Sequence, residues 1–304
     1  MESREVVNAL TIDVEDYFQV SAFESDIRRE DWGSFSLRVF ENTQRILQLL
    51  RAKKTLATFY ILGWVAEKRP DLVRAIQDDG HEIGTHSYWH RLIYNLTPNE
   101  FRDDLRQSVQ VLQDIVQMPI TTFRAPSFSI CQNSLWSVQT LASEGITTDS
   151  SIFPVVHDRY GIPGAPTEPY QIKTTAGDVT EFPPTVYSCF GFNLPVSGGG
   201  YFRLYPTAFT HRVLGRINRQ GRPFVFYLHP WEFDPEQPKM PKIGSRISRL
   251  RHRLNLKRTE PRFVCLLDRF HFAPMRQVLE SISTNRSVYE VNENERSLAR
   301  VKQT

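Results

Sequence analysis

The sequence predicts an α/β fold, a parallel sheet or a barrel in which strands and helices alternate along the chain. Short apolar, β-branched runs alternate with segments whose apolar residues recur at helical spacing, and the connections between them are short. Polar residues stand at the ends of several apolar runs, as expected at the rim of an α/β barrel. The chain has 304 residues, 40% of them hydrophobic, which is enough for a large buried core.

The first half of the chain carries the clearest alternation. Ser36 is the expected N-cap of the first helix, Gly80 the stop of the second, and Thr97, Pro98 and Glu100 open a longer one. The expected elements, in order, are a strand over 6–14, a helix over 36–51, a strand over 55–62, a helix over 70–80, a strand running into a loop over 81–87, a helix over 97–116, a strand over 120–126, a helix over 133–145 and a strand over 146–151.

The pattern changes after residue 155. Pro and Gly become dense, and short antiparallel strands and loops are expected as an insertion over 155–205. A helix over 206–221 and a strand over 223–230 then restore the alternation. We therefore expect a main domain over 1–234, a helical C-terminal extension over 235–290 packed on the barrel, and a polar, frayed tail over 291–304.

Composition argues against several classes of protein. The net charge of +3 does not indicate nucleic-acid binding. The three cysteines are scattered without a C-x-x-C pair, which argues against a disulfide framework or a cysteine zinc site. The start, MESREVVNALTIDVEDYF, lacks the features of a signal peptide, and no run of about 18 apolar residues occurs. We therefore expect a cytoplasmic protein that binds no nucleic acid.

Two short motifs carry metal-ligating residue types. DVED ends a predicted buried strand and crowds Asp13, Glu15 and Asp16 together, where charges need a partner, a metal or a shifted pKa. A solvated acidic turn is the alternative. HSYWH carries His86 and His90 four residues apart, the spacing of one face of a helical turn and also of a metal-free polar rim. One carboxylate and two histidines would form a three-ligand site with open positions, the arrangement of catalytic zinc sites.

Further polar residues follow other predicted strands. FRAP places Arg124 where its guanidinium can hold Asp13 ionised and oriented, or form an ordinary ion pair. YLHPWEF places His229 either as a satisfied rim residue or, beside a metal, as a general acid. Asp149 ends the predicted strand ITTDSS in the same way. Because strand ends gather at one rim of an α/β barrel, we expect these side chains to lie together.

In this order the stretches resemble the motifs of the NodB-homology polysaccharide deacetylases, carbohydrate esterase family 4. TIDVED matches the first motif, HSYWH the second, RAPSF the third and LHP the last, while TDSSIF stands loosely in place of the fourth. The resemblance implies a distorted (β/α) barrel of the NodB type, to which the inserted β region and the C-terminal helical extension are added. DVEDYFQVSAFE, DSSIFPVVHDRYGIPGAP, GGGYFRLYP and KRTEPRF further resemble deacetylases of bacterial exopolysaccharide clusters associated with exosortase and PEP-CTERM protein sorting.

The resemblance implies a role for each matching residue. Asp13 is expected as the catalytic base, Arg124 as the residue that orients it and His229 as the general acid. His86 and His90 are expected to bind a divalent metal, with zinc the first choice and Co, Ni or Mn as alternatives. The implied reaction is metal-assisted hydrolysis of an N-acetyl amide. Asp13 would take a proton from water, a backbone N–H would help to bind the oxyanion, and His229 would protonate the departing amine.

One position departs from the family pattern. The common pattern has two adjacent aspartates, the second binding metal, whereas Val14 follows Asp13 here. Some branches of the family use an acid two residues further on, so Glu15 is the expected third ligand and Asp16 the alternative. Val14 is also the one feature that favours a different class of protein, a non-catalytic saccharide-binding protein with a degenerate site.

The expected function is removal of N-acetyl groups from N-acetylhexosamine units of a bacterial exopolysaccharide or its precursor, so the partner is a polysaccharide or a lipid-linked saccharide. An amide hydrolase with the same site, acting on a formyl group or a small cyclic amide, is the alternative enzyme. Aromatic and polar side chains near the predicted rim are expected to contact the substrate: Tyr17, Trp89, Phe128, Asp149, His157, Arg159 and Trp231.

The segment 239–262 holds nine lysines and arginines. Ile243, Ile247, Leu250 and Leu254 fall on one helical stripe within it. Such a helix either packs its apolar stripe on the barrel and solvates its basic face, or lies on an anionic membrane surface. The second reading would make the protein membrane-peripheral.

Overall fold

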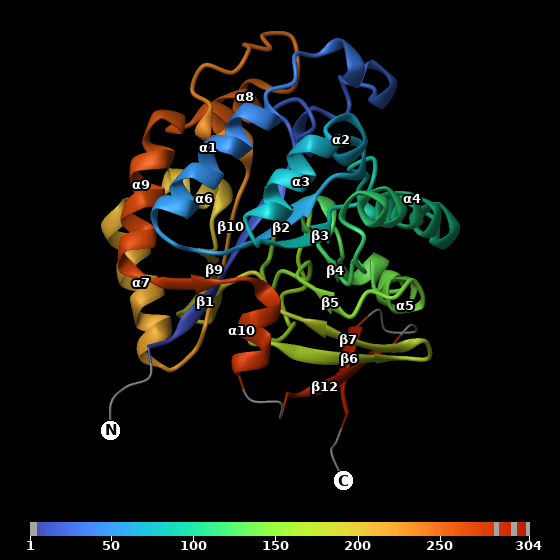
Figure 1. The fold of residues 1–304 in the computed structure, drawn as a ribbon. Coiled ribbons are helices and arrows are strands. Elements are labelled where there is room, and N and C mark those ends of the chain that lie inside the picture. The colour runs from blue at the N-terminus through green and yellow to red at the C-terminus, as the bar shows by residue number, and fades with distance from the viewer. Residues whose placement is uncertain (1–4, 283–285, 293–296, 302–304) are drawn as a thin grey trace.

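The computed structural model describes residues 5–282, 286–292 and 297–301 and confirms the α/β class (Figure 1). The strands are β1 (Val7–Val14), β2 (Thr58–Ile61), β3 (Glu82–Thr85), β4 (Thr122–Phe123), β5 (Thr148–Asp149), β6 (Tyr170–Thr174), β7 (Gly177–Glu181), β8 (Val186–Cys189), β9 (Phe192–Pro195), β10 (Val225–Leu228), β11 (His271–Ala273), β12 (Val288–Asn292) and β13 (Ser297–Arg300). The α-helices are α1 (Val39–Ala52), α2 (Gly63–Lys68), α3 (Pro70–Asp78), α4 (Pro98–Val116), α5 (Ser137–Ser143), α6 (Gly199–Leu204), α7 (Thr207–Arg219), α8 (Arg246–Arg253), α9 (Leu256–Arg269) and α10 (Met275–Ser281).

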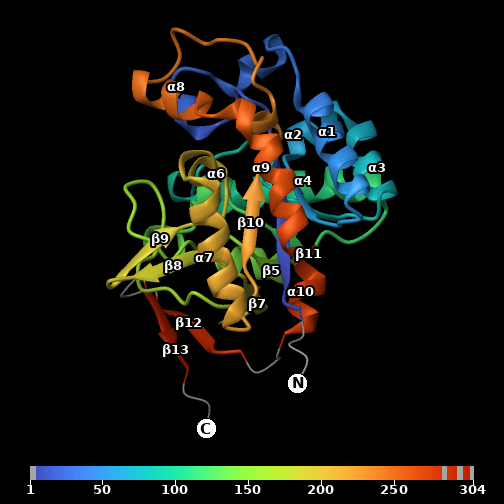
Figure 2. The same ribbon diagram turned by 90° about the vertical axis from the view of Figure 1, so that its left-hand side faces the viewer.

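One sheet organises the molecule. Within the described residues its order is β10-β1-β2-β3-β4-β5-β7-β6-β12-β13, with β11 also paired to β1. Every ladder from β10 to β7 is parallel, and the helices surround these strands (Figures 1 and 2). Parallel strands need crossover connections, which the intervening helices supply. The strand ends that carry the predicted polar residues therefore meet at one rim.

A continuous apolar core joins sheet and helices. It contains Ile12 of β1, Leu47 of α1, Ile76 of α3, Leu214 of α7 and Phe263 of α9, all fully buried. Each such side chain contributes roughly 1.5–3 kcal/mol when it leaves water. The helical periodicity seen in the sequence is therefore the pattern of faces that pack on this core. No helix in the described part of the chain is long and apolar enough to span a bilayer.

Local signals define α3 and α4 as predicted. Gly80 follows α3 with a positive φ of 82°, a conformation that glycine adopts at little cost. Thr97 caps α4, because its hydroxyl accepts a hydrogen bond from the backbone N–H of Glu100, whose carboxylate accepts one from the backbone N–H of Thr97.

The start of α1 differs from the prediction. The helix begins at Val39, and Ser36 is exposed and does not cap it. The Asp16 carboxylate, from the loop after β1, accepts the backbone N–H groups of Arg38 and Val39 at 2.7 and 2.9 Å. Asp16, a residue distant in sequence, therefore caps the N-terminus of α1.

The segment SGGGYFRL, expected to form strands and loops, forms helix α6 after Gly198. Gly198 has φ 136° and a bridge to Tyr227 of β10, and a Cβ there would lie 1.9 Å from the carbonyl oxygen of Tyr227. Only glycine permits this close approach of the two backbones.

Residues 288–292 and 297–300 form strands, whereas we expected a frayed tail from residue 291. β12 pairs in parallel with β6, and β13 returns antiparallel to β12. Tyr289, Val291 and Leu298 pack against a second apolar cluster. Pairing with the free edge of β6 is a tertiary event, so the polar local sequence did not reveal it. Residues 293–296 and 302–304 of the expected tail lie outside the described residues.

Candidate active site

The predicted polar residues meet at a cavity of about 430 Å³. Asp13 lies near the end of β1, while His86, Arg124 and His229 follow β3, β4 and β10 directly. The cavity is lined by Asp13, Glu15, Val20, Ser21, Ala22, His86, His90, Leu92, Tyr94, Ala125, Ser127, Phe128, His157, Asp158, Arg159, Tyr160, Tyr227, His229, Trp231 and Arg251. Such a rim of strand ends is the usual position of an active site in a parallel barrel.

Three buried side chains in this cavity form a group that can hold a metal ion. Glu15, His86 and His90 each offer one ligand atom, and these atoms lie within 4.8 Å of one another. Glu15 Oε2 is 2.7 Å from His90 Nε2, yet among the described residues it has no hydrogen-bond partner of acceptable geometry. A buried carboxylate oxygen without a hydrogen bond is costly unless a cation satisfies it. The donor set therefore fits a divalent metal of the type that binds imidazole and carboxylate.

The protonation of His86 also suits a ligand. Its Nδ1 lies 2.7 Å from the backbone oxygen of Arg124, which can only accept, so Nδ1 carries the proton and Nε2 keeps its lone pair. Burial lowers the pKa of His86 to about 4, so the ring is neutral at ordinary pH. Burial alone would raise the pKa of Glu15, but the surrounding histidines outweigh it and lower that pKa.

The HSYWH segment is a loop that follows β3, so the two histidines do not share a face of a helical turn. Ser87 and His90 both have positive φ, 65° and 51°. Asp104 of α4 accepts the backbone N–H groups of Tyr88 and Trp89 at 2.8 and 3.1 Å. This buried carboxylate therefore fixes the loop that carries both histidines.

Asp16, the alternative ligand, does not belong to the metal-binding group. Its oxygens accept the backbone N–H groups of Tyr17, Arg38 and Val39. The side chain is fully buried against the start of α1, so its oxygens are used in capping.

Arg124 is buried behind the cavity wall and forms an ion pair with Asp13. The guanidinium is fully buried, and one Nη donates to Asp13 Oδ1 at 2.8 Å. The other Nη and Nε donate to the Oγ and the carbonyl oxygen of Ser150 at 2.8 and 3.0 Å. Contacts on several nitrogens fix the plane of the guanidinium, and thereby the orientation of the Asp13 carboxylate.

Asp149 lies beneath this arrangement and does not reach the cavity. It is fully buried on β5 and pairs in register with Glu181 of β7. Burial raises the pKa of Asp149 to about 6, and burial and Asp149 together raise that of Glu181 well above its ordinary value. The Ser151 hydroxyl donates to Asp149 and accepts the backbone N–H of Ala125. Asp149, which we predicted to contact the substrate, therefore helps to fix the backbone next to Arg124 instead.

His229 is held by two buried charged residues. Its Nδ1 lies 3.0 Å from Glu232 Oε2, and Arg203 Nε donates to Glu232 Oε1 at 2.6 Å. Its Nε2 lies 3.9 Å from Asp13 Oδ2 and 3.8 Å from Glu15 Oε1. Burial would lower the pKa of His229, but Glu232 outweighs it and raises the pKa to about 9. The imidazole is therefore protonated near neutral pH.

The remaining predicted contacts divide into two groups. Phe128, His157, Arg159 and Trp231 line the cavity, and Trp231 Nε1 also donates to Glu15 Oε1 at 3.0 Å.

Tyr17 and Trp89 do not line the cavity, in contrast to the prediction. Tyr17 is buried in the core beside Phe18, and Trp89 packs against Trp32 and Tyr88. Large aromatic rings bury much apolar area, and here packing within the protein takes both.

Sequence reasoning missed three residues that position the site. Glu232 follows His229 by three residues in HPWEF, a spacing that could have suggested their contact. Arg203 lies in GGGYFRLYP, which carries a resemblance but gave no indication of this role, and Asp104 stands in a stretch without a local signal, since each acts on a segment distant in sequence.

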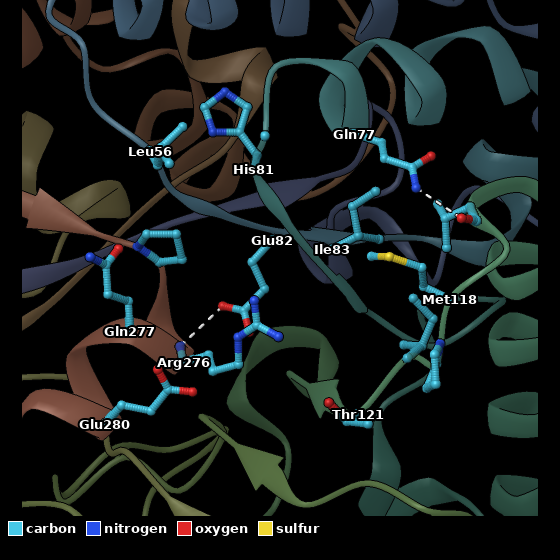
Figure 3. Close-up of a pocket in the computed structure, with 15 residues that line it drawn as sticks. Leu56, Gln77, His81, Glu82, Ile83, Met118, Thr121, Arg276, Gln277 and Glu280 are labelled. Carbon is cyan, nitrogen blue, oxygen red and sulfur yellow. Dashed lines mark hydrogen bonds between the residues drawn. The ribbon is translucent and has the colours of Figure 1, made fainter.

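A larger cavity, about 630 Å³, lies elsewhere in the molecule. It is formed by residues at the starts of β3 and β4, by the end of α4 and by α10 (Figure 3). Its partly buried carboxylate, Glu82, accepts hydrogen bonds from the Thr58 hydroxyl and the Arg276 backbone N–H. None of the residues that line the smaller cavity lines this one. The smaller cavity, with its candidate metal ligands, base and acid, is therefore the candidate active site.

Comparison with known families divides the chain in two. Residues 32–146 match the family model described as polysaccharide deacetylase. Residues 150–280 match a domain of unknown function, DUF3473.

Curated relatives agree with the first match. A peptidoglycan-N-acetylglucosamine deacetylase of Bacillus cereus is 30% identical over 122 residues, which are 36% of this chain and 44% of that protein. A peptidoglycan deacetylase of Helicobacter pylori is 30% identical over 110 residues, 36% of each chain. The chain therefore matches less than half the length of these relatives.

Solved structures agree with the fold. The chain resembles the crystal structure of a Mycobacterium smegmatis protein assigned to the polysaccharide deacetylases, with a TM-score of 0.62 and 18% identity. That likeness covers 100% of this chain and 95% of the other, and it is consistent with a distorted barrel of the NodB type. Residues 32–146 thus carry a similarity to the polysaccharide deacetylases of the NodB class, carbohydrate esterase family 4, and the fold of the chain is consistent with that class.

Proposed function

We propose that the protein is a metal-dependent hydrolase that removes N-acetyl groups from N-acetylhexosamine units of a bacterial exopolysaccharide or its precursor. The observation that carries the proposal is the meeting of Asp13 and His229 with the Glu15, His86 and His90 group in one cavity. Binding of a saccharide alone would not require a base, an acid and a metal group together. The similarity to deacetylases of N-acetylated glycans supports the same reaction class.

Asp13 acts as the general base in this proposal. Arg124 occupies Oδ1 of its carboxylate, so Oδ2 is left to accept a proton from the attacking water. A divalent metal, zinc as the first choice, held by Glu15, His86 and His90 supplies Lewis-acid chemistry for amide hydrolysis.

His229 acts as the general acid. Glu232 accepts a hydrogen bond from Nδ1 and keeps the ring protonated, so Nε2 can donate its proton to the departing nitrogen. Water adds to the carbonyl carbon, the C–N bond breaks, and the products are acetate and a free amino sugar.

The exopolysaccharide substrate is the finer part of the proposal. Aromatic side chains in the cavity wall, Phe128, Tyr160 and Trp231, can stack on sugar faces. The resemblance of DSSIFPVVHDRYGIPGAP and KRTEPRF to proteins of exosortase-associated clusters supports an exopolysaccharide precursor handled in the cytoplasm or at the membrane surface.

Acetate release tests the function. The wild-type protein is incubated with N-acetylglucosamine oligomers and with lipid-linked exopolysaccharide precursor, after chelation and after zinc is restored. We expect release only with metal, and a loss of at least about 100-fold in Asp13→Asn, the range for removal of a general base. A protein that binds zinc but releases no acetate from any of these substrates would favour the alternative amide hydrolase.

The metal ligands are tested by metal content. We expect Glu15→Gln to lose bound zinc, because it removes an anionic ligand. Asp16→Asn is the matched control and should keep zinc, since Asp16 caps α1. A wild-type protein with neither zinc nor acetate release would favour a saccharide-binding protein with a degenerate site.

A further inference from the structure

Helix α8 turns two apolar side chains away from the protein. Ile247 and Leu250 lie one helical turn apart and are 63% and 70% exposed. The one buried residue of the helix is His252, whose Nε2 lies 2.7 Å from Gln237 Oε1 and whose ring stacks on Trp231. The expectation that the apolar stripe packs on the barrel is therefore wrong for these two residues.

The outward side chains border the candidate active site. Leu250 precedes Arg251, and Val156, which is 83% exposed, precedes His157. Arg251 and His157 both line the cavity. Figure 2 shows α8 at the end of the molecule toward which the β10 arrow points. Exposed apolar side chains thus flank the cavity on two different segments.

The segment that contains α8 is strongly basic. Residues 239–262 hold nine lysines and arginines and a single acid, Glu260. Glu260 forms an ion pair with Arg45, outside the segment. Arg249 and Arg253 donate to backbone carbonyl groups, which leaves their charge unneutralised. Asp158 of the 156–159 loop and Asp26 beside Gly244 add two acids, so the surface around the exposed apolar pair keeps a net positive charge.

We propose that the rim formed by α8 and the 156–159 loop docks on an anionic lipid bilayer. Ile247 and Leu250 enter the headgroup region, and the basic side chains of 239–262 lie against the anionic lipids. A short surface helix with aliphatic side chains among arginines suits such an interface, and each basic residue near it adds attraction. The inference rests on the proposed function, because docking at this rim brings the cavity to a saccharide held by a membrane lipid.

Vesicle flotation tests the docking. The full chain, loaded with zinc, is mixed with phosphatidylglycerol-containing vesicles or with phosphatidylcholine vesicles, at low and high salt. We expect binding to the anionic vesicles only, weakened by salt because salt screens the charges. The double variant Ile247→Glu/Leu250→Glu should bind at least about tenfold more weakly, since it removes buried apolar area and adds negative charge.

Met118→Glu is the matched control. Met118 is 59% exposed in the wall of the larger cavity (Figure 3), which shares no lining residue with the candidate active site, and its substitution should leave vesicle binding unchanged. Zinc content and acetate release from soluble oligomers show whether each variant keeps its active site. Equal binding of wild type and double variant, or indifference of the wild type to anionic vesicles, would overturn the docking proposal.

The two proposals fail separately. A protein that deacetylates soluble oligomers but ignores anionic vesicles is an enzyme without this docking face. A protein that binds anionic vesicles through Ile247 and Leu250 but releases no acetate keeps the docking face, and its proposed function is wrong.

Discussion

His229, Glu232 and Arg203 form a row of alternating charge that runs inward from the partly exposed imidazole. Glu232 is fully buried between an imidazole and a guanidinium. Burial would raise the pKa of Glu232, but Arg203 and His229 outweigh it and lower that pKa to about 2. Glu232 therefore stays ionised at any pH at which the protein is handled, and its constant charge is what holds the proton on His229.

This row predicts a pH dependence of stability. The pKa of His229 rises from an ordinary 6.5 to about 9 in the folded protein. The protonated form favours folding, so its contribution is complete below pH 6.5 and is lost as pH rises through about 9. Urea denaturation of the chelated protein between these pH values should show the loss, and Glu232→Gln should reduce it.

The same row predicts the alkaline limit of activity. In Glu232→Gln the protonated form of His229 loses the carboxylate that stabilises it, so the pKa of His229 falls. The decline of kcat/KM with rising pH should therefore begin at least about one pH unit lower. Glu236→Gln, an exposed acid nearby, is the control. An unchanged alkaline limb in a Glu232→Gln protein that circular dichroism shows to be folded would contradict the assignment of His229 as acid.

Asp104 makes a prediction about metal affinity. Asp104→Ala removes the acceptor that fixes the backbone of Tyr88 and Trp89, so the two histidines lose their fixed orientation. Loss of such a support typically costs about 10–100-fold in metal affinity. Zinc titration should show this decrease, while Asp103→Ala, on the exposed face of the same helix, should match the wild type.

At the residue scale, the sequence predicted what stands at strand ends and missed what supports it. Asp13 stands near the end of an apolar strand and His86, Arg124 and His229 directly follow such strands, so a barrel brings them together by topology alone. Arg203 and Asp104 reach the site from helices, and the direction of a helical side chain depends on packing that local spacing does not encode.

At the scale of elements, α1 and the metal-binding group meet at neighbouring residues of one loop. Glu15 turns toward the histidines and Asp16 toward the N-terminus of α1. The four-residue acidic motif is therefore divided between a candidate metal ligand and a helix cap, which sequence alone left as alternatives.

The cap can be tested against the one that the sequence predicted. Asp16→Ala leaves two backbone N–H groups at the start of α1 without an acceptor, and should lower the free energy of unfolding by about 1 kcal/mol. Ser36→Ala should have no effect, because Ser36 is exposed and does not cap the helix. Equal effects of the two substitutions in urea denaturation would contradict the long-range cap.

Elements with strong local signals were predictable, and those that depend on a distant partner were not. Gly80 and the Thr97–Glu100 capping box set the ends of α3 and α4 through neighbouring residues alone. Helix α6 depends on the approach of Gly198 to Tyr227, and β12 depends on the edge of β6. A contact between remote segments leaves no periodicity in either of them.

At the scale of the whole molecule, the sheet runs through both family regions. β4 lies in the first region, β5 lies between the two regions, and β10 of the second region pairs with β1, which precedes the first. The parallel ladders therefore connect residues far apart in the chain, and neither region has a closed sheet of its own.

This continuity predicts a single unfolding transition. Tryptophan fluorescence and far-UV circular dichroism should give coincident urea curves for the full chain, the behaviour of one cooperative unit. A fragment ending at residue 149 lacks β10 and His229, and should show no cooperative transition. Two separate transitions in the full chain, or a folded fragment, would show that the regions are independent domains.

The hydrogen bonds from Arg124 to Ser150 have a consequence for descent. The guanidinium belongs to the region that matches the deacetylase family, and the two oxygens that hold it belong to the region of unknown function. Recombination that joined the first region to an unrelated second one would remove both Ser150 acceptors of Arg124. The guanidinium would keep its bonds to Thr11 and Asp13 but lose the contacts that fix its plane. We therefore expect the two regions to be inherited as a pair, with histories that share one branching order.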